Sequence, residues 1–250
     1  MRLLRFTLLA GLAGAALAAG TSYLLGARKI NGHVVRYREH WLARPDSHPE
    51  DVLHYVALGD SAAQGVGASH AGAGYVPTIA RRLAEATGRD VAITNLSVSG
   101  AVSGDVVRDQ LPAFEALTFV PDVVTLDIGG NDALFTRTNT VASFADALDR
   151  ILTALPSGSF VSDVPWMVLP GWIGRSQAMT ARAHELVARH DHHLVSLHER
   201  TRRAGYLGYP RHTAQDWFHP NDRGYASWAD AFWDVIVASG TVERLRRPGR

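Results

Sequence analysis

Cysteine does not occur among the 250 residues of this chain. Its absence excludes disulfides, thiolate metal sites, a cysteine nucleophile and a lipid-modified cysteine. Lysine is nearly as scarce, because Lys29 is the only lysine among 25 basic residues. The formal net charge is +1 and the basic residues are spread along the chain, so we expect no nucleic-acid partner. The arginines within residues 241–250 are interpreted as a solvated basic C-terminal tail.

Long apolar runs are also scarce, and the one that stands out is the uncharged stretch at residues 6–25. Arginines precede it, Arg28-Lys29 follows it, and its length is about the 20 residues that a helix needs to cross a bilayer. We expect residues 1–27 to be a signal peptide or an N-terminal membrane anchor. The sequence therefore predicts an extracytoplasmic protein, secreted or membrane-anchored, with membrane association through residues 6–25.

The remaining composition is that of a folded domain. Hydrophobic residues make up 46% of the chain and charged residues 20%, which permits a full core and argues against disorder. Residues 28–50 are polar, rich in arginine and histidine, and end in a proline-containing stretch, so they are expected to form a linker or collar. One domain is expected over residues 51–240.

Short apolar runs and helical patterns alternate from residue 52 onward. The runs expected to form strands lie at 53–58, 91–96, 123–128, 159–164 and 193–197. Apolar residues at helical spacing occupy 76–87, 105–117, 141–155, 176–189 and 222–238. Strands that alternate with helices of this length are joined by crossovers and run parallel. The sequence therefore predicts an α/β fold with helices on both faces of a sheet and a ligand site at the carboxyl ends of the strands.

A serine directly after the first predicted strand is a candidate nucleophile. Ser61 follows a buried apolar run and is expected at a rigid edge of the sheet. Asp216 and His219, three residues apart, supply a base for the serine proton and a carboxylate that orients this base. Ser61 alone is better explained as a helix cap, so the prediction of a catalytic set depends on all three residues.

Two further strand ends contain residues suited to stabilising an oxyanion. Gly100 follows the second strand, and without a Cβ its backbone N–H can approach a reacting carbonyl. Asn131 follows the third strand and donates from a side-chain amide that adds no titrating charge. The predicted oxyanion hole consists of the backbone N–H groups of Ser61 and Gly100 and the amide of Asn131.

The chain resembles a known family in four blocks, which occur in order over residues 52–236 around Ser61, Gly100, Asn131 and His219. That family is the SGNH (GDSL-type) hydrolases. The resemblance implies a three-layer α/β/α sandwich with a mostly parallel, roughly five-stranded, flavodoxin-like sheet. It also implies an esterase or lipase activity on lipids, acetylated sugars, thioesters or simple esters.

The same resemblance matches Asp216 to the family's carboxylate and implies that Asp60 supports the serine turn by hydrogen bonding. Asp132, which follows the asparagine of the third block, is expected to support the site in a similar indirect way. Ala62 stands where the family's first block usually has leucine, a change that affects local packing and no chemistry.

The reaction expected from these residues is hydrolysis of a small-molecule, lipid or glycan ester through a Ser61 acyl-enzyme, with no metal ion and no organic cofactor. Two alternatives stay open. The same acyl-enzyme transfers its acyl group to a sugar or an alcohol, or the domain is a catalytically silent ligand-binding domain on a membrane anchor. The apolar segment 165–172 is expected to form an acyl pocket or lid, or to pack on the sheet edge or the membrane.

Sequence motifs typical of other enzyme and binding-protein classes are absent or incomplete. The Gly-x-Ser-x-Gly elbow is absent because Ala63 occupies its last position, and no P-loop is present. The dinucleotide fingerprint is incomplete because His70 stands at its third glycine. The histidine-rich run 190–193 is interpreted as a solvated connection and not as a metal site.

Overall fold

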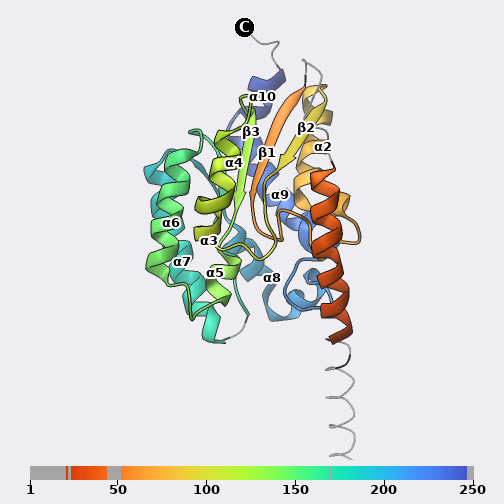
Figure 1. Cartoon of the computed structure of the whole chain (residues 1–250), viewed down its shortest axis with the longest axis vertical. Helices are drawn as coiled ribbons and strands as arrows, with labels where there is room; N and C mark the ends of the chain where they lie inside the picture. The colour runs from red at the N-terminus through yellow and green to blue at the C-terminus, as the bar shows by residue number, and fades with distance from the viewer. Residues whose placement is uncertain (1–20, 22–23, 44–51, 169, 247–250) are drawn as a thin grey trace, which may run out of the picture.

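The computed structural model describes residues 21, 24–43, 52–168 and 170–246 (Figure 1). Five parallel strands form one sheet in the order β2-β1-β3-β4-β5. The strands are β1 Leu53–Gly59, β2 Val91–Asn95, β3 Val123–Asp127, β4 Phe160–Ser162 and β5 His193–Val195. The register aligns Ala57 of β1 with Asn95 of β2 and Thr125 of β3, so the carboxyl ends of these strands meet at one edge.

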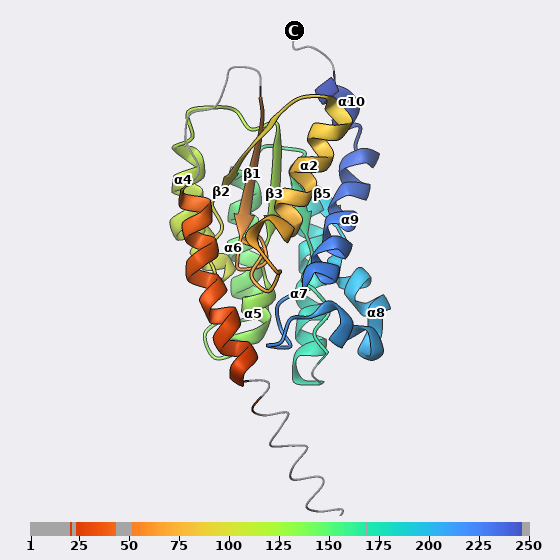
Figure 2. The ribbon, with the colours of Figure 1, turned by 90° about the vertical axis from the view of Figure 1, so that its right-hand side faces the viewer.

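Helices cover both faces of the sheet, as the two perpendicular views show (Figures 1 and 2). On one face lie α2 Tyr75–Thr87, α9 Asp222–Ala238 and α10 Thr241–Arg246. On the other lie η2 Val106–Gln110, α4 Leu111–Glu115, α6 Val141–Ala154 and α7 Pro170–Arg189. The remaining short elements are η1 Ala71–Ala73, α3 Ser103–Asp105 and α5 Gly130–Leu134, and α8 Leu197–His212 packs beside α9. The three-layer α/β/α sandwich is therefore confirmed.

Helix α9 shows why the sequence folds in this way near the site. Tyr225, Phe232 and Ile236 lie on one face at helical spacing and are fully buried against the sheet. Asn221 caps the helix, because its side-chain oxygen accepts a hydrogen bond from the backbone N–H of Gly224. The segment that precedes α9, which contains His219, therefore enters the domain at a defined position.

The N-terminal helix, residues 24–42, corrects one expectation. A linker or collar was expected over residues 28–50, but the described residues up to 42 are helical and pack on the domain. Tyr37 and Trp41 are buried, and they donate hydrogen bonds to the carbonyl oxygens of Ala68 at 2.7 Å and Gln64 at 3.1 Å. The helix is thus attached to the loop that follows Ser61.

The basic tail expected at residues 241–250 also differs, because α10 buries Thr241, Val242 and Leu245 against the domain. Within the stretches that the structure describes, no helix is long and apolar enough to cross a membrane. The apolar run 6–25 lies outside those stretches except at residues 21, 24 and 25. Its role as a signal peptide or anchor therefore stays a prediction.

Candidate active site

Ser61 lies in the turn that follows β1. The turn begins at Gly59, whose φ of +142° is a conformation that residues with a side chain rarely adopt. A Cβ at position 59 would also lie 2.1 Å from the carbonyl oxygen of Asp127 on the neighbouring strand. Glycine therefore lets the chain turn while β1 stays paired with β3, and Ser61 is placed at the sheet edge.

Ser61, His219 and Asp216 are brought together as the sequence predicts. The Oγ atom of Ser61 lies 2.9 Å from Nε2 of His219, and Nδ1 of the same ring lies 2.5 Å from Oδ2 of Asp216. Ser61 is 4% exposed. The serine hydroxyl, the imidazole and the carboxylate thus form a continuous line of hydrogen bonds, the arrangement in which an imidazole can take a serine proton.

The loop that holds Asp216 and His219 is fixed from several sides. Oδ1 of Asp216 accepts hydrogen bonds from the backbone N–H groups of Phe218 and His219, each at 3.1 Å. Trp217 has a φ of +58°, and its carbonyl oxygen accepts a hydrogen bond from the Tyr209 hydroxyl at 2.6 Å. A strained backbone at a bulky residue persists only where its surroundings impose it, which is common at functional sites.

The charge of Asp216 is favoured by this environment. Partial burial favours its neutral form, but the hydrogen bond and charge of His219 and the two backbone N–H groups act in the other direction. The net effect is a pKa of Asp216 below its usual value. The carboxylate is therefore ionised when His219 becomes an imidazolium.

A second glycine permits close contact between the loop after β1, residues 60–70 (the serine loop), and the loop between α8 and α9, residues 213–221 (the histidine loop). Gly67 has a φ of +102°, and a Cβ there would lie 2.4 Å from the carbonyl oxygen of Pro220 and 2.8 Å from Cβ of His219. Any side chain at position 67 would push the histidine loop away from the serine loop.

The predicted oxyanion donors are less uniformly placed. Within the part of the chain that the structure describes, the backbone N–H groups of Ser61 and Gly100 donate to no other backbone or side-chain group. The amide nitrogen of Asn131 donates to the carbonyl oxygen of Ala101 at 3.0 Å and to Oδ2 of Asp60 at 3.3 Å. The two backbone N–H groups therefore have no acceptor among the described residues, whereas the Asn131 amide has one hydrogen bond of 3.0 Å and one of 3.3 Å.

Asp60 and Asp132 both hold backbone segments of the site. Oδ1 of Asp60 accepts a hydrogen bond from the N–H of Ala62 at 2.9 Å, which closes the serine turn. Asp132 accepts hydrogen bonds from the N–H and the hydroxyl of Ser103, at 2.9 and 2.6 Å, and so ties the segment after Gly100 to α5. Burial raises the pKa of both carboxyls, that of Asp60 strongly, with the Asp127 charge acting in the same direction.

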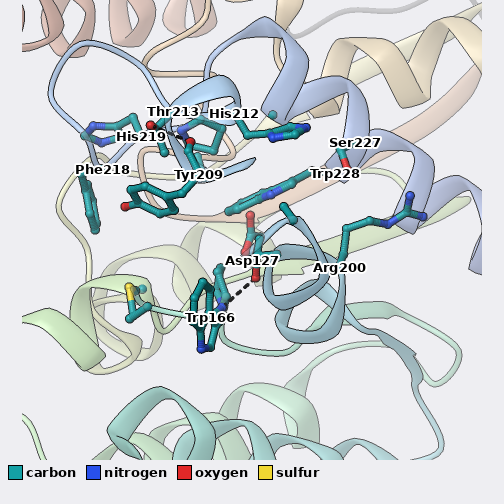
Figure 3. A pocket seen from close by; sticks show the side chains of 18 of the residues that line it. Asp127, Trp166, Arg200, Tyr209, His212, Thr213, Phe218, His219, Ser227 and Trp228 are labelled. Atoms are coloured by element: carbon teal, nitrogen blue, oxygen red, sulfur yellow. Dashed lines mark hydrogen bonds between the residues drawn. The ribbon is translucent and has the colours of Figure 1, made fainter. Parts of the chain in front are cut away.

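A largely apolar cavity opens beside Ser61 and His219 (Figure 3). Its apolar lining comes from the segment after β4, from α8, from the histidine loop and from α9, and the main side chains are Trp166, Met167, Tyr209, Phe218 and Trp228. Pro165 lines it too, so the segment 165–172 contributes to the pocket, one of the roles expected for it. Sequence reasoning missed the contributions of α8 and α9, because no motif marks them.

Asp127 is an ionisable group in this cavity that sequence reasoning also missed. It is 3% exposed, and Figure 3 shows it drawn between the rings of Trp166 and Trp228. Its Oδ1 accepts a hydrogen bond from the Ser162 hydroxyl at 2.8 Å, whereas Oδ2 has no partner in the described part of the chain. Burial raises its pKa to about 7. A carboxylate at the end of an otherwise apolar strand was the signal in the sequence.

Exchange of Asp127 for asparagine is expected to stabilise the protein in alkaline solution. In the unfolded chain an aspartate titrates at about 4, but in the folded protein the pKa of Asp127 is about 7. Folding of the wild type therefore buries a charge above pH 7 and none below about pH 4. The stability advantage of the variant over the wild type accordingly grows as the pH rises from about 4 to about 7. We expect a Tm higher by roughly 5 °C or more at pH 8.

Thermal unfolding at pH 4 and pH 8 measures the Tm difference between the variant and the wild type. The matched control is Asp109→Asn, at an exposed aspartate paired with Arg108, which is expected to show no comparable dependence on pH. A Tm difference for the Asp127 variant that is the same at both pH values would contradict the prediction.

Comparison with known proteins agrees with this geometry. The GDSL-like Lipase/Acylhydrolase family model matches residues 57–227. No curated protein sequence matches the chain significantly.

Solved structures with the same fold include a lipase/acylhydrolase from Enterococcus faecalis, with 22% identity, 80% of this chain and 100% of that chain covered, and a TM-score of 0.61. A family 3 carbohydrate esterase from Clostridium thermocellum has 20% identity, covers 78% of this chain and 100% of its own, and has a TM-score of 0.61. A phospholipase A1 from Streptomyces albidoflavus NA297 has 19% identity, covers 74% and 99%, and has a TM-score of 0.56. At these identities the likeness shows the fold.

Proposed function

The chain belongs to the GDSL-like lipase/acylhydrolase family of ester-cleaving hydrolases, and from this premise we propose that it cleaves a carboxylic ester through an acyl-enzyme on Ser61. The observation that carries the proposal is the line of hydrogen bonds from Ser61 through His219 to Asp216, at 2.9 and 2.5 Å. Ser61 and His219 lie 158 residues apart in the sequence, and the fold alone does not require their side chains to meet at a cavity.

The first half of the reaction forms the acyl-enzyme. Oγ of Ser61 attacks the ester carbonyl carbon while Nε2 of His219 takes the hydroxyl proton, and Asp216 stabilises the imidazolium. The tetrahedral intermediate then expels the alcohol, which receives the proton from His219. In the second half, His219 takes a proton from water, the resulting hydroxide attacks the acyl carbon, and the proton returns to Ser61 as the acid leaves.

The oxyanion of each intermediate is held by the backbone N–H groups of Ser61 and Gly100 and by the amide of Asn131. The assignment of the two backbone donors is supported because neither N–H group has an acceptor among the described residues. The long hydrogen bond from Asn131 to Asp60, at 3.3 Å, is the one exchanged for the oxyanion, while the bond to Ala101 keeps the amide in place. Asp60 and Asp132 position these donors and touch no reacting atom.

The apolar cavity receives the acyl group. Trp166, Phe218 and Trp228 line it within the same pocket as Ser61, and burying an acyl chain there gives about 0.8 kcal/mol per methylene. Arg200, which also lines the cavity, is paired with Asp234 at 3.0 Å, so its charge is already balanced without a substrate carboxylate.

An extracytoplasmic location, with residues 6–25 as an anchor in the membrane, is part of the same proposal. It rests on the charge pattern of the N-terminus, an uncharged stretch followed by Arg28-Lys29.

Turnover of p-nitrophenyl esters by the full chain tests the proposal and separates it from acyl transfer. We expect equal amounts of p-nitrophenol and free acid in water. In the presence of an alcohol or sugar acceptor, the free acid is expected to remain the main product. An acyl-acceptor ester as the main product would favour the transferase, and no turnover of esters from acetyl to decanoyl would favour a silent binding domain.

A further inference from the structure

Exposed apolar side chains gather at the end of the molecule where the active site opens. Of the ten large apolar side chains that are exposed in the described stretches, six lie on this face. We call them the apolar rim: Leu24, Leu25, Phe135, Tyr206, Leu207 and Trp217, with exposed fractions from 46% to 89%. They come from the first residues of the described helical stretch 24–42, the end of α5, the second half of α8 and the histidine loop, which lie together at the lower end of Figures 1 and 2.

A groove between these elements leads to the catalytic serine. It is lined by residues of the N-terminal helix, α5, α7, α8 and the histidine loop, including Tyr206 and Trp217 of the apolar rim. Its volume is about 670 Å³, which is in the range of ligand sites. Met167, Tyr209 and Phe218 line both this groove and the cavity that contains Ser61. An apolar path therefore runs from the exposed rim to the nucleophile.

The direction of the chain identifies what covers this face. The described stretch 24–42 of the N-terminal helix has its first residues at the rim, and it is held there, because Gly26 lies so close to Gln215 of the histidine loop that a Cβ would sit 2.6 Å from that residue. The uncharged residues 6–23 precede this point directly, and with residues 24 and 25 they are about long enough to cross a bilayer. A membrane entered by this segment lies next to the rim.

The charge and the residue types around the rim fit a lipid surface. Arg28, Lys29, Arg137 and Arg211 are exposed near the rim and form no ion pair within the described part of the chain. Basic side chains flanking apolar ones are attracted to anionic headgroups, and tryptophan and tyrosine, here Trp217 and Tyr206, prefer the membrane interface.

We propose that this face of the protein lies on a lipid bilayer, with the apolar rim in the interface and the groove as the route by which an acyl ester passes from the bilayer to Ser61. The route rests on the proposed ester cleavage at Ser61, whereas the docking rests on the proposed membrane anchor, so the two can fail separately. A partner protein or a second copy of the chain on this face is the competing outcome.

The absence of cysteine allows a direct test with the full chain. A single cysteine is introduced by Leu207→Cys on the rim, and the protein is labelled with a polarity-sensitive fluorophore and placed in nanodiscs that contain phosphatidylglycerol. The matched control is Val120→Cys, which is 85% exposed and precedes β3, at the opposite edge of the sheet. Phe135→Cys provides a second rim position. Neither rim position is close in sequence to the anchor, so contact there reports on the orientation of the domain.

We expect a blue-shifted emission for the labels at positions 207 and 135, and quenching by nitroxide-bearing lipids at least about twofold stronger than at position 120. Equal quenching at all three positions, or quenching that is strongest at position 120, would overturn the proposal. So would a label at position 207 that is shielded in lipid-free protein by self-association. Hydrolysis of a soluble p-nitrophenyl ester by the same samples shows separately whether the proposed activity is present.

Discussion

Replacement of Ser61 by alanine is expected to lower kcat for a p-nitrophenyl ester by about 10⁴-fold or more. Ser61 supplies the oxygen that attacks the substrate ester in the proposed reaction, so its loss leaves only a slow attack of water, aided by the donors and the binding site that remain. The variant is expected to fold normally, because the substitution removes one buried hydroxyl whose hydrogen bond is to His219.

Steady-state kinetics of the purified variant measure the loss, and Ser69→Ala is the matched control. Ser69 lies in the same loop as Ser61 but is exposed, and its recorded hydrogen bond is from its backbone N–H to Asp222. The double variant Ser61→Ala, His219→Ala is expected to be no slower than Ser61→Ala. His219 acts by taking the proton of Ser61, so its removal costs no further activity once Ser61 is gone. More than about a hundredth of wild-type activity in Ser61→Ala would contradict the assignment.

Asp216→Asn is expected to lower kcat by about 10⁴-fold while the geometry of the loop is kept. The asparagine oxygen can still accept the hydrogen bonds from the backbone N–H groups of Phe218 and His219. Its amide nitrogen then faces Nδ1 of His219 and donates to it, so that the proton of the ring moves to Nε2. With a proton on Nε2 the ring cannot accept the proton of Ser61.

The control for this variant is Asp222→Asn, six residues further along the chain. Oδ1 of Asp222 accepts a hydrogen bond from the backbone N–H of Ser69, and an asparagine oxygen can accept the same bond. Wild-type kcat in the Asp222 variant and a large loss in the Asp216 variant are expected from parallel kinetic measurements. Similar kcat values in both variants would show that Asp216 does not orient the base.

The sheet and the candidate catalytic set could be predicted from the sequence for physical reasons. All five strands lie within the predicted intervals or extend one residue past them, because each is a short apolar run bounded by turn residues. In a parallel sheet the carboxyl ends meet at one edge, so a serine after β1 and an asparagine after β3 are close whatever the loops do. The contact between Ser61 and His219 does not follow from the sheet, because His219 lies in the loop between α8 and α9; the sequence indicated it through the Asp216 and His219 pair and the family resemblance.

The helices that shape the pocket were harder to predict. Helix α8 has a non-helical residue at Gly205, a proline at position 210 and Leu197 as its one fully buried side chain, so it has no apolar stripe. The N-terminal helix did have a signal, because Ile30, His33, Tyr37 and Trp41 are buried at helical spacing, but its many arginines and histidines suggested a linker. The roles of Gly100 and Asn131 stay predictions, because they depend on a bound oxyanion.

The central claim is that Ser61 is the nucleophile, and location of a covalent adduct tests it most directly. The full chain is treated with a fluorophosphonate, which reacts with activated serines, and the modified peptide is sequenced by mass spectrometry. We predict a single adduct on Ser61, at a rate that falls to background in His219→Ala. An adduct on another serine, or full loss of activity with Ser61 unmodified, would contradict the account.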